Sequence, residues 1–143
     1  MYAELLERIA AEQASYGAVP QNPATDAELA RLRRRADEEL GVELPAEYEE
    51  FLKRVNGLDW NGVLLYASET TTIAGVVEMN LVFRDDPHFA DLLALGSDGL
   101  DVYTYRTATG TYEIYDEVPH NLVASGLSFE DLMTRALTRS LQG

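Results

Sequence analysis

The chain has 143 residues, a length typical of one domain, and its 46% hydrophobic and 25% charged residues are typical of a folded chain and not of a disordered one. It has no cysteine, which excludes disulfides, thiolate metal sites and a catalytic thiol. The net charge of −14, from 25 acids against 11 bases, disfavours nucleic acids and anionic membranes as partners and favours cations or a basic protein. The alternative is that the acidity only confers solubility.

The N-terminal segment predicts a helix over about residues 2–16. Its apolar residues Leu5, Leu6 and Ile9 recur at helical spacing, and Gly17 ends the pattern. This segment has neither the basic start nor the apolar centre of a secretory signal, and no later apolar run reaches the ~20 residues of a membrane span. We therefore expect a cytoplasmic protein.

A second helix is predicted over about residues 26–40, because Thr25 and Glu28 form a capping box and Gly41 follows the apolar stripe. This helix contains a run of arginines, which is one indication of phosphate binding. Acids follow one turn later and can pair with the arginines at positions i+3 and i+4. We therefore expect a self-neutralised, solvated helix face, formed by Arg31, Arg33, Arg34, Arg35, Asp37, Glu38 and Glu39.

A third helix is predicted to begin at Pro45, where the missing N–H of proline costs nothing, and to end at Asn56-Gly57. A first strand follows over residues 63–66. Residues 72–84 are ambiguous, because their apolar positions fit both a helical and an alternating pattern. We favour a helix there.

The C-terminal part predicts more of the sheet and a last helix. A strand covers residues 92–95, and two alternating runs at 101–106 and 111–115 form a hairpin whose turn contains Gly110. Ser128 is the N-cap of the last helix.

The predicted fold is α+β, with a small, mostly antiparallel sheet and helices packed around it. We expect one domain over residues 1–143, in which residues 1–24 form an additional N-terminal helix and linker.

The element order and several short motifs resemble the SUKH superfamily, and more narrowly its YrhA-like branch. The longest motif is LPAEYEEFLKRVNG at residues 44–57. It is accompanied by Gly41, Asn61-Gly62, Asn80 with Arg84, Gly96-Ser-Asp-Gly99, Gly110 and Ser128-Phe129. The superfamily includes fungal cell-wall-assembly regulators and many bacterial immunity proteins. The resemblance covers about the whole chain and implies a SUKH-like binding domain that is not an enzyme.

Two functions follow from this resemblance. The first is a cytoplasmic immunity protein that neutralises a toxin, such as a nuclease, by direct binding, and the second is a housekeeping binding module linked, for example, to cell-wall assembly. The acidic charge supports a basic toxin domain as the partner, and we expect a monomer or weak homodimer. Charge and loop position select as contact residues Asp59, Trp60, Asp85, Asp86, Asp116 and Glu117. For Trp60 a buried loop anchor is the alternative to a partner contact.

No catalytic, cofactor or metal site is predicted. His88 lies between carboxylates, as in a metal site, but Pro87 and the polar surroundings favour an exposed loop. His120 is likewise predicted in a loop, and neither histidine is a convincing general base. Ser97 lacks the glycine pattern of a nucleophile elbow.

Overall fold

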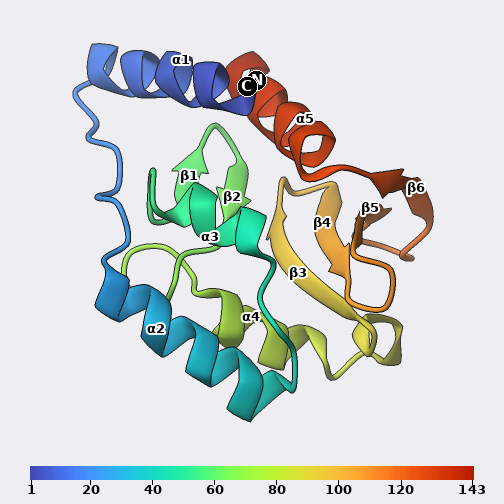
Figure 1. The fold of residues 1–143 in the computed structure, drawn as a ribbon. Coiled ribbons are helices and arrows are strands. Elements are labelled where there is room, and N and C mark those ends of the chain that lie inside the picture. Colours follow the sequence, from blue (N-terminus) through green and yellow to red (C-terminus); the bar gives the residue numbers. More distant parts are fainter.

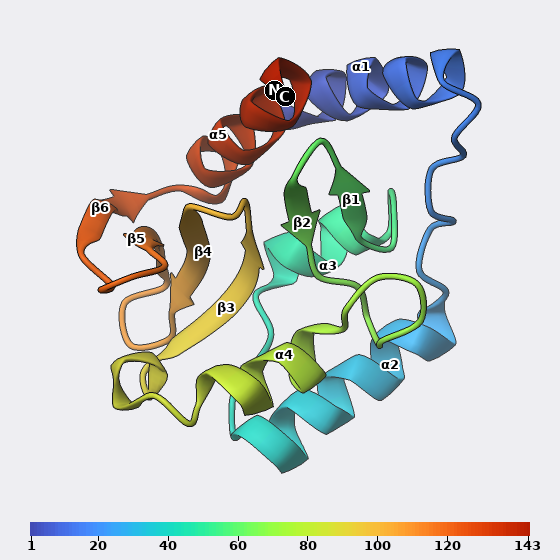
Figure 2. The same ribbon diagram turned by 180° about the vertical axis from the view of Figure 1, so that it is seen from behind.

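The computed structural model describes residues 1–143 and shows one antiparallel sheet between two groups of helices (Figure 1). Helices α1 (Tyr2–Ser15) and α5 (Phe129–Gln142) lie together at the top of the view. Helices α2 (Asp26–Arg35) and α4 (Val76–Phe83) lie together at the bottom, as the reverse view also shows (Figure 2). Between these groups, α3 (Ala46–Leu52) packs against the sheet.

The six strands form an antiparallel meander in which each strand pairs with the next one along the chain. The strands are β1 (Leu58–Trp60), β2 (Val63–Leu65), β3 (Leu92–Ser97), β4 (Asp101–Arg106), β5 (Thr111–Asp116) and β6 (Leu122–Leu127). Strands β1 and β6 are therefore the two edges of the sheet. The predicted α+β fold with a small antiparallel sheet is confirmed, and the fold is consistent with that of SUKH proteins.

The helix starts follow the capping chemistry of the sequence. Thr25 Oγ1 accepts a hydrogen bond from Glu28 N at 3.1 Å, and Glu28 Oε1 accepts one from Thr25 N at 2.8 Å, so the predicted capping box is present. The predicted helix over about 26–40 is present, with one change in its winding. Residues Asp26–Arg35 are α-helical, and the last turn, η1 (Ala36–Leu40), is π-helical.

The ambiguous segment is a helix, as predicted, because Val76, Val77 and Asn80 are buried at helical spacing. Two strands were not predicted: β1, which has only three residues, and β6, which contains Gly126 with φ of 64°. Strand β3 continues through the predicted end at Gly96. A short 3-10 helix, η2 (Pro87–Phe89), precedes β3.

The residues of the 44–57 motif contribute to the core of the fold. Tyr48 is fully buried, and its ring packs against Phe51 and Phe129 at centroid distances of 5.4 and 6.3 Å. The Tyr48 hydroxyl donates to the backbone oxygens of Tyr66 and Leu95 in the sheet. The motif thus fixes α3 against the sheet. None of the helices combines the length and apolar character of a membrane span.

Candidate functional site

The segment between α4 and β3 meets the loop between β5 and β6, which lies far from it in the sequence. Nε2 of His120 lies 2.9 Å from Oδ2 of Asp86. Oδ1 of Asp116 accepts hydrogen bonds from the backbone N–H groups of His120, at 2.9 Å, and of the next residue, at 2.8 Å. We call residues 85–91 and 116–121 the acidic loops. They contain four of the six predicted contact residues, namely Asp85, Asp86, Asp116 and Glu117.

The two histidines of the chain lie together between these loops. The rings of His88 and His120 stack at a centroid distance of 5.0 Å and an interplanar angle of 11°. His88 also contacts Tyr115 and Phe89 edge to face, at 4.5 and 4.9 Å. His120 lies in a loop, as predicted, whereas His88 lies in the 3-10 helix η2. The predicted exposure is wrong, since both histidines are partly buried and in mutual contact. The contact joins residues far apart in the sequence, so no local pattern indicates it.

The electrostatics of this cluster follow from its packing. Burial lowers the pKa of His88, and the nearby His120 lowers it further, against a smaller opposing effect of Asp86. Nε2 of His88 is buried without a hydrogen-bond partner. The backbone N–H of His88, which donates to Asp86 Oδ1 at 2.9 Å, lowers the pKa of Asp86, and His120 adds to this effect. At neutral pH Asp86 is therefore ionised and His88 uncharged.

A second polar group lies next to His88, on β4 and β5. Glu113 Oε1 accepts hydrogen bonds from Arg106 Nε, at 2.9 Å, and from the Tyr115 hydroxyl, at 2.7 Å. Burial opposes ionisation of Glu113, but these two hydrogen bonds outweigh it and lower the pKa of this carboxyl. No three His, Asp or Glu side chains lie in an arrangement that could hold a metal ion.

The other two predicted contact residues lie at the opposite edge of the sheet. Asp59 and Trp60 belong to β1 and not to a loop, which corrects the sequence interpretation. The Trp60 indole Nε1 donates to Glu12 Oε1 in α1 at 3.2 Å, and its ring lies 6.0 Å from that of Tyr16. Asp59 is exposed and Trp60 is half-buried. The six residues therefore form two separate groups, one near β6 and one on β1.

Exposed apolar residues lie beside the acidic loops, and the sequence interpretation missed them. Leu122 and Val123 on β6 are 54% and 49% exposed, while Val118, within the acidic loop 116–121, is 86% exposed. Leu100, 63% exposed, is linked to this loop because its backbone oxygen accepts a hydrogen bond from Glu117 N at 2.8 Å. An alternating pattern would have indicated which side of β6 is buried, but the strand LVASGL has none.

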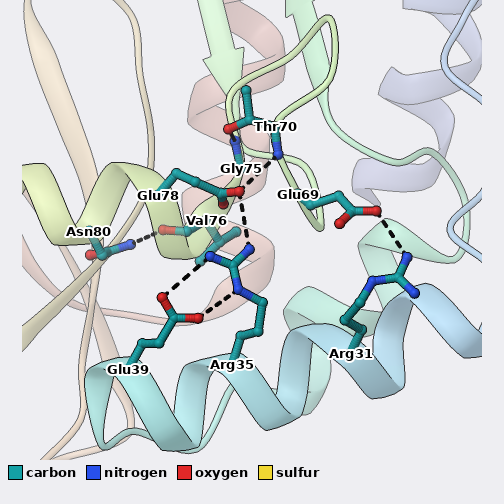
Figure 3. A network of polar contacts seen from close by, with 9 residues as sticks. All are labelled: Arg31, Arg35, Glu39, Glu69, Thr70, Gly75, Val76, Glu78 and Asn80. Carbon is teal, nitrogen blue, oxygen red and sulfur yellow. Dashed lines mark hydrogen bonds and ion pairs between the residues drawn. The ribbon is translucent and has the colours of Figure 1, made fainter.

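The arginines of α2 are held by acids from several elements (Figure 3). Arg35 pairs with Glu39 at 2.6 Å, as the i+4 spacing predicted, and also with Glu78 of α4 at 3.1 Å. Arg31 pairs with Glu69 at 2.9 Å, outside the helix. The prediction of neutralisation within α2 therefore needs a correction, because much of it comes from the loop before α4 and from α4 itself.

The same network shapes the loop before α4. Glu78 Oε2 also accepts a hydrogen bond from Thr70 N at 3.3 Å, and Thr70 Oγ1 accepts one from Gly75 N at 2.9 Å (Figure 3). This loop is thereby fixed to α2. The network has a structural explanation and needs no ligand.

A polar hollow of about 470 Å³ lies between α5 and the sheet and is lined in part by Tyr103, Arg135 and Arg139. Arg139 pairs with Asp98 at 3.1 Å and with Asp101 at 3.2 Å. The charge of Arg139 is thus balanced within the chain.

The model of the SMI1 / KNR4 family (SUKH-1) matches residues 23–135, from the segment before α2 into α5. Among curated proteins none matches the chain significantly. The family match therefore covers the sheet, both acidic loops and all helices except α1 and the end of α5.

Proposed function

Because the chain belongs to the SMI1 / KNR4 family (SUKH-1), we propose that it is a cytoplasmic immunity protein that neutralises a bacterial toxin by direct binding. The family match over residues 23–135 carries this proposal. Membership in a SUKH family supports a binding domain of the immunity type, in a family that is generally not catalytic. Membership in the narrower YrhA-like branch stays a prediction.

The charge of the chain supports a basic partner. The net charge is −14, and Asp85, Asp86, Asp116 and Glu117 lie in the two acidic loops beside exposed apolar residues. Complementary charge raises the rate of protein association and selects against partners of the wrong sign. A basic toxin domain such as a nuclease fits this surface. Asp59 and Trp60 at the opposite edge form a second, smaller candidate contact.

The same charges argue against nucleic acids and anionic membranes as partners. Three of the four arginines in α2, the most basic stretch of the sequence, form ion pairs: Arg31 with Glu69, Arg33 with Glu49, and Arg35 with Glu39 and Glu78. Phosphate groups would have to displace these internal carboxylates.

The second candidate function is a housekeeping binding module with the same fold. The family match favours it as well, since the SUKH superfamily that the chain resembles includes fungal cell-wall-assembly regulators as well as immunity proteins. Gene neighbourhood separates the two functions, because an immunity gene lies beside the gene of its toxin.

The experiment that tests the immunity function is a pull-down with the tagged chain from its native cells at low and high salt. Recovery of a basic toxin domain that salt releases supports the proposal. Co-expression must then protect cells from that toxin. Recovery of envelope or regulatory proteins alone favours the housekeeping function, and failure to bind an expressed neighbouring toxin refutes the immunity function.

Charge reversal then tests the acidic loops. Asp85→Lys and Glu117→Lys each change the charge by two units within the loops, while Glu38→Lys makes the same change at an exposed position of η1. We expect the loop variants to bind the captured partner with a lower association rate and the η1 variant to bind almost as the parent does. An equal decrease in association rate for all three variants would show that the net charge alone, and not the acidic loops, determines the rate.

A further inference from the structure

Strand β6 is an open edge of the sheet. It pairs with β5 on one side, and no strand pairs with it on the other (Figures 1 and 2). An unpaired edge presents backbone N–H and C=O groups that another chain can bind, and proteins usually protect such edges with lysine, proline or irregular pairing. Residues 122–127 contain no charged residue and no proline. What protects this edge is irregular geometry, namely the two register shifts in its pairing with β5 and the positive φ of Gly126.

The surface next to this edge is apolar and then acidic. Leu122 and Val123 are about half exposed on the strand itself, and Val118 is 86% exposed in the loop that precedes it. Asp116 and Glu117 begin that same loop. A chain lying along β6 would therefore contact apolar side chains and pass close to carboxylates.

These features distinguish between two possible occupants of the edge. A second copy of this chain would bring a net charge of −14 and its own acidic loops to the same place, and like charges in contact are repelled. An extended segment with alternating basic and apolar residues would meet both the carboxylates and the apolar side chains, while its backbone would continue the sheet.

We propose that β6 receives an extended basic segment of the partner protein as a seventh strand of the sheet. This inference rests on the proposed function in that the partner is a protein. It adds the binding mode, namely main-chain pairing at β6, and the chemistry of the segment, which alternates lysine or arginine with apolar residues.

The test uses synthetic peptides and the full-length chain, so that it does not depend on capture of a natural partner. The probe is a capped octapeptide of alternating lysine and valine. One comparison peptide has glutamate in place of lysine, and a second has proline in place of valine and so lacks half of the backbone donors. Binding is followed by amide NMR spectra of the ¹⁵N-labelled chain and by hydrogen exchange of its backbone amides.

We expect the lysine–valine peptide to shift the amide signals of residues 122–127 saturably and to slow exchange of the outward-facing ones. The glutamate peptide should not bind. The proline peptide should bind at least about tenfold more weakly, because a tenfold loss of affinity corresponds to the loss of roughly one or two hydrogen bonds. Amide signal shifts that are confined to β1, or that do not saturate with peptide concentration, would overturn the proposal.

Two pairs of variants locate the binding on the chain. Val123→Lys places a charge on the edge, whereas Val19→Lys makes the same change in the linker after α1, where the side chain is 81% exposed. We expect about tenfold weaker peptide binding for Val123→Lys and a change of less than about twofold for Val19→Lys. Glu117→Lys should also weaken binding, in contrast to Glu38→Lys. Equal affinities of the Val123 and Val19 variants would refute main-chain pairing at β6.

Self-association is a further outcome that would overturn the proposal. If the β6 signals move with the concentration of the chain alone, the edge is an interface between two copies. Failure of the immunity function is recognised separately, since it is decided by the pull-down and protection experiments and not by the peptides.

Discussion

The side chain of Asn80 binds both backbone groups of Ala94. Nδ2 of Asn80 donates to the Ala94 oxygen at 2.8 Å, and Oδ1 of Asn80 accepts from Ala94 N at 2.7 Å. Nδ2 also donates to the Val76 oxygen one turn earlier in α4, at 2.8 Å. Asn80 is fully buried. It replaces a strand partner for the centre of β3, close to the point where the pairing with β4 shifts register, and so fixes α4 to the sheet.

Replacement of Asn80 should therefore be costly. Asn80→Ala leaves the N–H and C=O of Ala94 buried without partners, and we expect a loss of about 2–4 kcal/mol in the free energy of unfolding. Urea denaturation measures this loss. Asn22→Ala is the matched control, because Asn22 is exposed and its side chain makes no comparable contact, so a change below about 0.5 kcal/mol is expected. Similar losses for both variants would contradict the role of Asn80.

Gly96 is required by the close approach of β2 and β3. A Cβ atom on Gly96 would lie 2.3 Å from the Leu64 oxygen and 2.8 Å from Leu65 Cδ2. Because the first contact is with the backbone of a paired strand, it cannot be relieved by a side-chain rotation. We expect Gly96→Ala to destabilise the chain by about 3 kcal/mol or more.

Thermal unfolding of Gly99→Ala provides the comparison for Gly96. Gly99 has a positive φ of 86° but no atom within 4 Å of an added Cβ, so its replacement should cost about 1–2 kcal/mol through backbone strain alone. A smaller loss at Gly96 than at Gly99 would contradict the crowding between β2 and β3.

Much of the fold could be predicted from the sequence because its signals are local. The capping box of Thr25 and Glu28 and the cap at Ser128 give the starts of α2 and α5. The helix at 76–83 was harder to predict from the sequence. The hydrogen bonds between Asn80 and Ala94, which distinguish it from a strand, join residues that are distant in the sequence. Strand β6 was missed, because its apolar residues do not alternate and its pairing with β5 is irregular.

The candidate site was predicted less well than the fold. Loop acidity drew attention to Asp86 and Asp116, but it gave no sign that His120, predicted only as a loop residue, joins them. Its contacts depend on how two separate loops fold back, which no spacing in the sequence encodes. Whether these acids bind a partner stays a prediction.

The partly buried imidazole of His88 should make the stability depend on pH. Its pKa is lowered in the folded chain, so the unfolded chain binds the proton more readily. The contribution of uncharged His88 to the free energy of unfolding is therefore fully present above the ordinary histidine pKa of about 6.5. It is lost as the pH falls through the lower pKa of the folded chain. We expect the melting temperature to fall between pH 7.5 and pH 5.

His88→Gln isolates this effect, because glutamine does not titrate. The groups around His88 are His120, Asp86, Arg106, Glu113 and Tyr115. The pKa values of Asp86 and Glu113 are lowered, so both stay ionised over this range. The variant should show a shallower pH dependence of its melting temperature than the parent chain. An identical slope would mean that His88 does not resist protonation.

Trp60 is expected to act as an anchor between β1 and α1 and not as a dominant partner contact. Its indole N–H is already bound to Glu12, and its ring lies near Tyr16, whereas interface residues that dominate affinity are completed by the partner. Trp60→Phe removes the hydrogen bond to a carboxylate and should lower the free energy of unfolding by about 1–2 kcal/mol in urea titrations. Glu12→Gln weakens the same hydrogen bond from the other side, and the two losses should not add fully.

The affinity of Trp60→Phe for a captured partner should stay within about twofold of the parent chain, since replacement of a residue that dominates the interface would cost about 2 kcal/mol or more. A large loss of affinity at unchanged stability would instead place the partner on β1, at the opposite edge of the sheet from β6.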